Sequence, residues 1–349
     1  MQKGNKKSID LTNNFDFFRF FAASLVWYSH CYALTGKQDN LANFSGFESF
    51  GKIGVAIFFI ISGYFITASF YNRKQILPFI INRILRIFPA LIVLVLLSVF
   101  VIGAIYTRLN LYDYFTNKET WTYLKIIQIF PQYYNLPGVF LDNPANPPII
   151  AVNGSLWTLK YELKFYIAVA LLGVLGILQP RLILALFISL FAIRIYGATT
   201  EPEMIFGMKW GGFNLTLTLA SLFAGGAIMF LWKEKIKLDK WLFILAAFSF
   251  YISIFLPPSF SAILWNFSLI YIVIYLGFLR IPLLHKFGNW GDFSYGMYLY
   301  AFPMQQISLQ ILGKNPNFSH FLILSFDLTL VCAVLSWLFI EKPALRFKR

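Results

Sequence analysis

The chain has 349 residues, of which 58% are hydrophobic and only 13% are charged, and its formal net charge is +14. A soluble globular protein carries about 25% charged residues, so this composition excludes that class and indicates an integral membrane protein. The positive charge needs no nucleic-acid partner, because basic loops next to a lipid bilayer face anionic headgroups.

Ten transmembrane helices are predicted in an all-α, polytopic fold, because apolar runs close to the ~20 residues that cross a bilayer recur along the chain. The runs are 15–34, 51–70, 87–106, 156–178, 181–197, 212–232, 241–256, 260–279, 291–312 and 320–340. With a cytoplasmic N-terminus, the inner segments carry 18 Lys and Arg and the outer segments carry seven. That bias predicts that both termini are cytoplasmic.

The first run could be mistaken for a secretory signal. It is too long for one, contains Arg19 and His30, and leads to no convincing cleavage site. We expect a single transmembrane domain over 1–349, with no fused periplasmic domain. Its longest outer segment, 107–155, mixes aromatic residues with the turn-rich run LDNPANPP, which favours an ordered cap or a partly re-entrant loop.

Arg19 and His30 both lie inside the first run, FDFFRFFAASLVWYSHCYAL. Eleven residues at about 100° each amount to three turns plus roughly 20°, so both side chains leave one helix face about 16 Å apart. Ionisable groups inside a membrane helix are costly and are functional candidates. A structural role stays open for each, since His30 could bond a neighbouring helix and Arg19 could pair with Asp16 one turn earlier.

Small and basic residues follow in the next two runs. In GVAIFFIISGYFI, Ser62 and Gly63 stand among bulky residues, where they permit close approach of a ligand or simply of another helix. In INRILRIFPAL, Arg83 and Arg86 share one face, and we expect them at the N-terminal end of a helix on the cytoplasmic side. Guanidinium groups beside free backbone N–H groups suit a phosphate, although basic residues also flank membrane helices routinely.

Glu162 follows in the segment NGSLWTLKYELKFY, about six residues inside the fourth predicted span. Helix rise places both Glu162 and His30 roughly 21 to 22 Å above the inner edge of a ~30 Å hydrocarbon layer. We therefore expect the carboxylate to meet and orient the imidazole. The alternative is an internal ion pair of Glu162 with Lys160 or Lys164.

Six motifs in order make the chain resemble the acyltransferase-3 family of bacterial membrane O-acyltransferases over nearly its whole length. The motifs are NNFDFFRFFAASLVWYSH with Arg19 and His30, FFIISG with Ser62 and Gly63, NRILRIFP with Arg83 and Arg86, SLWTLKYELKFY with Trp157 and Glu162, FGNWGDFSYGMYLYAFPMQQ, and WLFIEKPAL. Many members have a histidine before the proline of the fifth motif, where this chain has Ala301.

The resemblance implies transfer of an acyl group, most often acetyl, from cytoplasmic acyl-CoA to a hydroxyl of a cell-surface or exported saccharide, or of a lipid-linked glycan. It implies a multi-pass protein of the bacterial cytoplasmic membrane, with acetyl-CoA as a substrate and no permanently bound cofactor. We expect His30, Glu162 and Arg19 to be catalytic. Arg83, Arg86, Ser62 and Gly63 are expected to bind the donor.

Acceptor contacts are expected from Trp157, Trp121 and Tyr133, although interfacial anchoring explains Trp and Tyr equally well. His30 is expected to act as the general base, with an acyl-histidine intermediate as the alternative. No metal site is expected, because Cys31 and Cys332 lack ligand spacing. A multi-pass transporter or a membrane polysaccharide polymerase is the alternative function; binding of coenzyme A would separate these classes from an acyltransferase.

Overall fold

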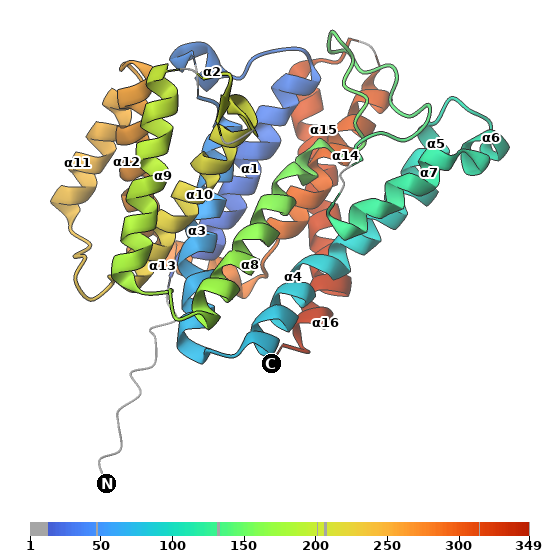
Figure 1. Ribbon diagram of the computed structural model, residues 1–349. Helices are drawn as coiled ribbons and strands as arrows, with labels where there is room; N and C mark the ends of the chain where they lie inside the picture. Colours follow the sequence, from blue (N-terminus) through green and yellow to red (C-terminus); the bar gives the residue numbers. More distant parts are fainter. Residues whose placement is uncertain are drawn as a thin grey trace.

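Long apolar helices make up most of the structure, which is a computed structural model (Figure 1). It describes residues 13–46, 48–130, 133–200, 202–205, 208–313 and 315–348, without the side chains of 198, 258–260, 262 and 263. The predicted all-α class is confirmed for these residues, apart from one small hairpin in which β1 (Met204–Ile205) pairs antiparallel with β2 (Met208–Lys209).

The helices alternate in direction along the bundle. The first half contains α1 (Phe15–Leu34), α2 (Asn40–Ser45), α3 (Phe50–Arg73), α4 (Ile76–Leu97), a π-helical segment (Ser98–Gly103), α5 (Ala104–Tyr106), α6 (Leu111–Thr116), α7 (Lys118–Thr122), two 3-10 helices (Tyr123–Gln128 and Gly154–Thr158) and α8 (Leu159–Val174). The second half contains α9 (Pro180–Thr200), α10 (Trp210–Leu231), α11 (Lys240–Ser253), α12 (Pro258–Phe278), α13 (Pro282–His285), a 3-10 helix (Phe287–Asn289), α14 (Ser294–Leu312), α15 (Phe318–Ser336), a second π-helical segment (Trp337–Glu341) and α16 (Lys342–Leu345).

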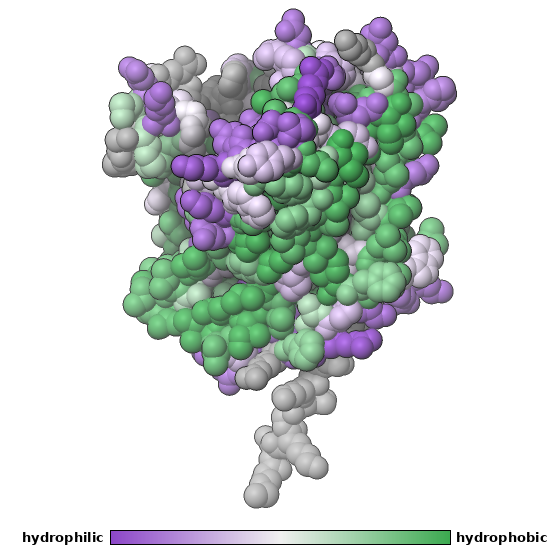
Figure 2. Space-filling model, turned by 90° about the vertical axis from the view of Figure 1, so that its right-hand side faces the viewer, coloured by the Kyte–Doolittle hydropathy of each residue, from purple (hydrophilic) through white to green (hydrophobic). Residues whose placement is uncertain are grey.

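Each of the ten predicted spans falls on helical structure, but fewer helices have the length and apolarity of a membrane span. Five of the described helices meet that standard, and a sixth is added if the pair 264–278 and 282–289, bent by 80°, counts as one span. On one face of the molecule, hydrophobic residues cover the middle and lower part (Figure 2). Exposed apolar side chains of α4 include Ile84, Ile92 and Leu96. The chain is therefore a membrane protein with about five candidate spans.

Helix α4 begins earlier than the predicted span 87–106. It starts at Ile76 and continues through the π-helical segment to Tyr106. Pro78 does not prevent this start, because it lies in the first turn, where its missing N–H costs no helical hydrogen bond. Arg83 and Arg86 consequently lie two turns inside the helix. The expectation that they sit beside the free N–H groups of a helix N-terminus is wrong.

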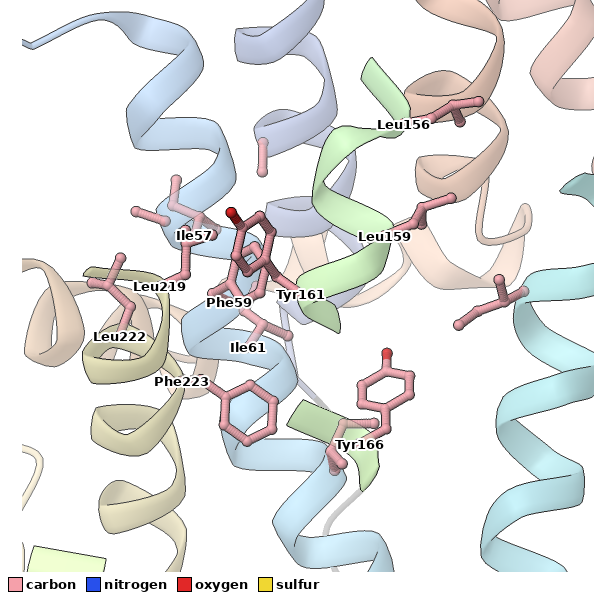
Figure 3. Packing of buried hydrophobic residues seen from close by; sticks show 14 of the residues in the cluster. Ile57, Phe59, Ile61, Leu156, Leu159, Tyr161, Tyr166, Leu219, Leu222 and Phe223 are labelled. Carbon is pink, nitrogen blue, oxygen red and sulfur yellow. The ribbon is translucent and has the colours of Figure 1, made fainter. Parts of the chain in front are cut away.

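Helix α3 lies at the centre of the apolar core, between α10 and α8 (Figure 3). Glycines bring α3 and α10 together: a Cβ on Gly63 would lie 1.9 Å from the carbonyl oxygen of Phe223, and a Cβ on Gly226 would lie 2.1 Å from that of Ile60. Gly63 is therefore a helix-packing residue, which is the alternative that the sequence left open for it.

We expect Gly63→Ala to lower the thermal unfolding midpoint, because backbone atoms of α10 cannot yield to a Cβ at that distance. Gly211→Ala, at the start of α10, is the matched control, since a Cβ at that position would meet nothing within 4 Å. Tryptophan fluorescence of the purified protein during heating measures both midpoints. Equal midpoints for the two variants would contradict the packing role.

The segment 107–155 contains α6, α7 and a 3-10 helix, which Figure 1 shows beside the far end of α4. The Tyr114 hydroxyl ties it to the bundle by donating to the carbonyl oxygen of Val99 at 2.9 Å, and the Thr120 hydroxyl ties α7 to α6 by donating to that of Tyr114 at 2.6 Å. Asn143 donates to the buried amide oxygen of Gln306 on α14 at 3.0 Å. These contacts fix the segment over α4 and α14.

Candidate active site

Two cavities lie toward opposite ends of α1 and α3. The larger, of about 760 Å³, is lined by Arg19, Arg83 and Arg86 and is called the arginine cavity. The smaller, of about 470 Å³, is lined by His30 and is called the histidine cavity. Since Arg19 and His30 belong to one helix, α1 runs past both cavities. Substrates bound in the two cavities could therefore approach each other along this helix.

The two cavities share two described lining residues, which are called the wall. Val55 of α3 and Tyr298 of α14 line both of them. The Tyr298 hydroxyl donates to the backbone carbonyl of Ser155 and is hydrogen-bonded to the Thr158 hydroxyl. Sequence reasoning missed Tyr298, although it belongs to the fifth motif, because nothing local distinguishes it from the neighbouring Tyr295 and Tyr300.

His30 lies at the wall with its ring edge toward Phe302, at a centroid distance of 5.3 Å. Its Nδ1 is 3.5 Å from the hydroxyl of Ser155. Asn153 holds this segment in place, because its side chain accepts from the backbone N–H of Ser155 at 3.1 Å and donates to the carbonyl oxygen of Leu299 at 2.7 Å. Because Nδ1 lies next to Ser155, Nε2 is the ring nitrogen that can contact a substrate.

The expected contact between Glu162 and His30 is not seen among the described residues. Its carboxylate accepts a hydrogen bond from the hydroxyl of Tyr166, one turn later on α8, and it lines the arginine cavity. It makes no ion pair with Lys160 or Lys164 among the described residues, because those ammonium groups lie over the ring of Tyr161. The depth estimate is wrong, because His30 lies beside Ser155, and Glu162 follows Ser155 by seven residues, roughly 10 Å of helix rise, toward the other cavity.

Arg19 lines the arginine cavity and pairs with Asp16 at 2.9 Å. Its guanidinium group also lies 5.2 Å from the ring centre of Phe65 on α3. The local ion pair is the one that the sequence suggested. The pair uses one of the five N–H groups of a guanidinium, and Arg19 lines the cavity, so the pair and a ligand contact are compatible.

Arg83 and Arg86 share the arginine cavity but differ in their partners. Arg86 pairs with Asp292 at 2.6 Å and with Glu341 at 3.3 Å, and the Glu341 side chain is only 2% exposed. Arg83 stacks on the ring of Tyr166, and its buried Nε has no partner among the described residues. Arg86 therefore joins α4 to the C-terminal segments, whereas Arg83 retains an unused donor.

The arginine cavity is basic overall. Within the described chain, its lining contains six basic side chains (Arg19, Arg73, Arg83, Arg86, Lys233 and Lys348) and three acidic ones (Asp16, Glu162 and Asp292). Burial, together with repulsion from Arg86 and Arg83, lowers the pKa of Lys348 to about 8. A cavity that holds unbalanced cations in this way favours an anionic ligand. Ser62 lies in the same lining.

The histidine cavity contains polar residues that sequence reasoning did not select. Glu48 lies just before α3, and Arg194 lies on α9 with Nη1 3.3 Å from the hydroxyl of Ser221. Burial raises the pKa of Glu48 to about 7, and the charges of Lys52 and Arg194 oppose that shift. The signal for Arg194 was present, since it is a lone cation inside a predicted span.

Trp157 is one of the three aromatic residues expected on the acceptor side, and it lines the histidine cavity. Trp121 and Tyr133 line neither cavity. Trp121 packs near Phe115 and donates to its carbonyl oxygen at 2.7 Å, and Tyr133 packs against the apolar core. In the described structure these two residues stabilise the segment 107–155.

Comparison with known proteins adds a consistent set of similarities. A family model described as an acyltransferase domain, Acyl_transf_3, matches residues 12–337. The O-acetyl transferase of Shigella phage Sf6 is 30% identical over 348 residues, which cover 95% of each chain. Nodulation protein 10 of Rhizobium leguminosarum bv. viciae is 34% identical over 179 residues, which cover 49% of this chain and 47% of that protein.

The peptidoglycan O-acetyltransferase OatA of Listeria monocytogenes is 25% identical over 344 residues, which cover 84% of this chain and 51% of that protein. The chain thus matches almost the full length of the phage protein and about half of the other two relatives. No solved structure matches the chain.

Proposed function

Because the chain belongs to the acyltransferase-3 family and is an O-acetyltransferase, we propose that it carries an acetyl group across the wall between its two cavities. The donor is cytoplasmic acetyl-CoA, which binds in the arginine cavity. The acceptor is a hydroxyl of a saccharide or lipid-linked glycan in the histidine cavity. The observation that carries the proposal is the shared wall of Val55 and Tyr298, with a basic cavity on one side and a histidine on the other.

Charge supports the donor side of the proposal. The phosphate groups of coenzyme A would contact Arg83, whose Nε has no partner in the described structure, and Lys348 in its protonated form. The pantetheine arm is long and thin, so the thioester can extend past Ser62 and Glu162 toward the wall. Arg19 contributes positive charge beside this path, where it can stabilise the donor or the developing oxyanion.

The proposed reaction uses His30 as a general base. The imidazole takes the proton of the acceptor hydroxyl while the oxygen of that hydroxyl attacks the carbonyl carbon of the thioester. The new C–O bond forms, the C–S bond breaks, and the imidazolium returns the proton to the leaving thiolate of coenzyme A. Ser155 positions the ring through Nδ1, which is the role that was predicted for Glu162. We propose that Glu162 acts from the donor side instead.

The site of action follows from the same geometry. With the arginine cavity open to the cytoplasm, the histidine cavity would face the outer side of the cytoplasmic membrane, where surface saccharides are completed. OatA is named as acting on peptidoglycan, so a glycan of the cell wall is one acceptor to test. Acetyl-CoA is consumed as a substrate, and the proposal requires no permanently bound cofactor.

Enlarging the wall residue tests the proposal directly. We expect Val55→Phe to stop acetyl transfer while acetyl-CoA still binds, because the added ring occupies the space at the wall where the thioester and the acceptor hydroxyl would meet. Val55→Ala, the matched control, should retain transfer. Calorimetry with acetyl-CoA measures donor binding, and mass spectrometry of the surface glycans of the host measures O-acetyl groups. Normal transfer by a folded Val55→Phe protein, or no donor binding by the wild type, would contradict the two-cavity reaction.

A further inference from the structure

Unpartnered polar atoms gather around the histidine cavity. Among the described residues, Nε of Arg194, Oε2 of Glu48, Oγ of Ser261 and Nε1 of Trp265 are buried without a hydrogen-bond partner, and all four residues line this cavity. Buried polar atoms in folded proteins are nearly always satisfied, and each exception requires an explanation. Four exceptions around one cavity indicate that a polar ligand completes them.

These groups are held in place by the surrounding helices. The exposed fraction is 9% for Arg194, 1% for Ser261 and 6% for Trp265. Arg194 is fixed by its contact with Ser221 and by the ring of Phe191, whose centre lies 5.4 Å from the guanidinium carbon. Ser261 and Trp265 are one turn apart on α12 and therefore project from the same face. The groups on α9 and α12 are therefore fixed in place, and Glu48 joins them from the segment just before α3.

The chemistry of the set indicates what it would hold. Arg194 and Trp265 offer N–H donors, Glu48 offers an acceptor, and the Ser261 hydroxyl can do both. An isolated anion would leave the acceptor oxygen of Glu48 unpaired, and an apolar ligand would leave every group unpaired. A ring that carries several hydroxyls satisfies donors and acceptors together. The flat faces of Trp157 and Trp265 also suit the C–H faces of such a ring, and the volume lies in the range of small-molecule sites, roughly 300–1,000 Å³.

We propose that Glu48, Arg194, Ser261 and Trp265 form the acceptor subsite, which binds a neutral pyranose ring and presents one of its hydroxyls to His30. The proposal rests on the function proposed above and adds the residues that select the acceptor. These residues touch the acceptor only. Their loss should therefore raise the KM for the acceptor and leave the affinity for acetyl-CoA unchanged.

Two variants isolate the effect. Ser261→Ala removes one hydroxyl at nearly constant volume, and Trp265→Phe removes the indole N–H together with part of the ring system. Each should raise the acceptor KM about tenfold, the effect of one lost hydrogen bond in a closed site. The thermal midpoint of ligand-free Ser261→Ala should stay equal or rise, because an apolar group replaces an unpaired buried polar atom. A residue that only stabilises the fold would shift the midpoint downward. Ser189→Ala and Trp241→Phe, on exposed positions of α9 and α11, are the matched controls.

The experiment uses the full-length protein in lipid nanodiscs, so that no sugar-based detergent competes for the site. Acetyl-CoA is the donor, a panel of methyl pyranosides of neutral hexoses supplies the acceptors, and release of the coenzyme A thiol reports the rate. The expected result is saturable acceptance of at least one pyranoside by the wild type, with a raised KM in Ser261→Ala and Trp265→Phe alone. The calorimetric affinity for acetyl-CoA should be equal in all five proteins.

The outcomes separate this inference from the proposed function. Failure of the wild type to bind acetyl-CoA would refute the donor site and with it the proposed function. Normal donor binding with no pyranoside accepted would overturn the pyranose assignment alone. An unchanged acceptor KM in both variants would overturn the subsite, whatever their thermal midpoints.

Discussion

Replacement of His30 by Gln or Ala is expected to abolish acetyl transfer while the affinity for acetyl-CoA stays the same. The imidazole lies at the wall, with one ring nitrogen next to Ser155 and no acidic partner among the described residues. It lines the cavity opposite the donor. Loss of a general base typically costs 10²–10⁴-fold in rate. We therefore expect a fall of at least about 100-fold in the O-acetyl content of the glycan made per unit of protein.

His320→Ala is the control for the His30 variants, because His320 is exposed at the start of α15 and lines neither cavity. Calorimetry with acetyl-CoA establishes that the donor site is intact in each protein. Two results would count against the role of His30. The first is normal transfer by His30→Gln, and the second is a loss of donor affinity equal to the loss of transfer.

The two arginines of α4 are expected to fail in different ways when each is replaced by Ala. Arg86→Ala leaves Glu341 buried and Asp292 partly buried without their cation, and breaking a buried ion pair from one side costs about 3–5 kcal/mol. Arg83→Ala removes no ion pair of the described structure, so the fold should persist. It should lose about 1.5–3 kcal/mol of donor affinity, the contribution of a charged hydrogen bond.

Thermal midpoints and acetyl-CoA calorimetry on the same preparations distinguish the two roles. Arg181→Ala, at the exposed start of α9, controls for the loss of a positive charge at this end of the bundle. Arg86→Lys should recover part of the midpoint, because an ammonium group can still pair with one carboxylate. If Arg86→Ala keeps the wild-type midpoint and loses donor affinity as Arg83→Ala does, then Arg86 is a phosphate ligand rather than a structural cation.

Composition and local pattern were sufficient to predict the class and the family of this protein. Apolar runs and a low charged fraction predicted helices in the right order, because burial in lipid acts on segments about 20 residues long and leaves a signal in each. The six motifs predicted an O-acyltransferase, and the family match over residues 12–337 confirms that prediction. The boundary of α4 was missed, because arginines and prolines interrupt its apolar run, although the helix continues past them.

The relative heights and contacts of the helices were decided only by the tertiary structure. Helix rise alone predicted one height for His30 and Glu162, whereas His30 lies beside Ser155, two turns before Glu162. Which neighbour each side chain meets depends on packing between distant segments, such as the close approach of α3 and α10 at Gly63. Packing placed Glu162 with the arginines, joined Arg86 to Glu341 across 255 positions of the chain, and brought Arg194 to the cavity of His30.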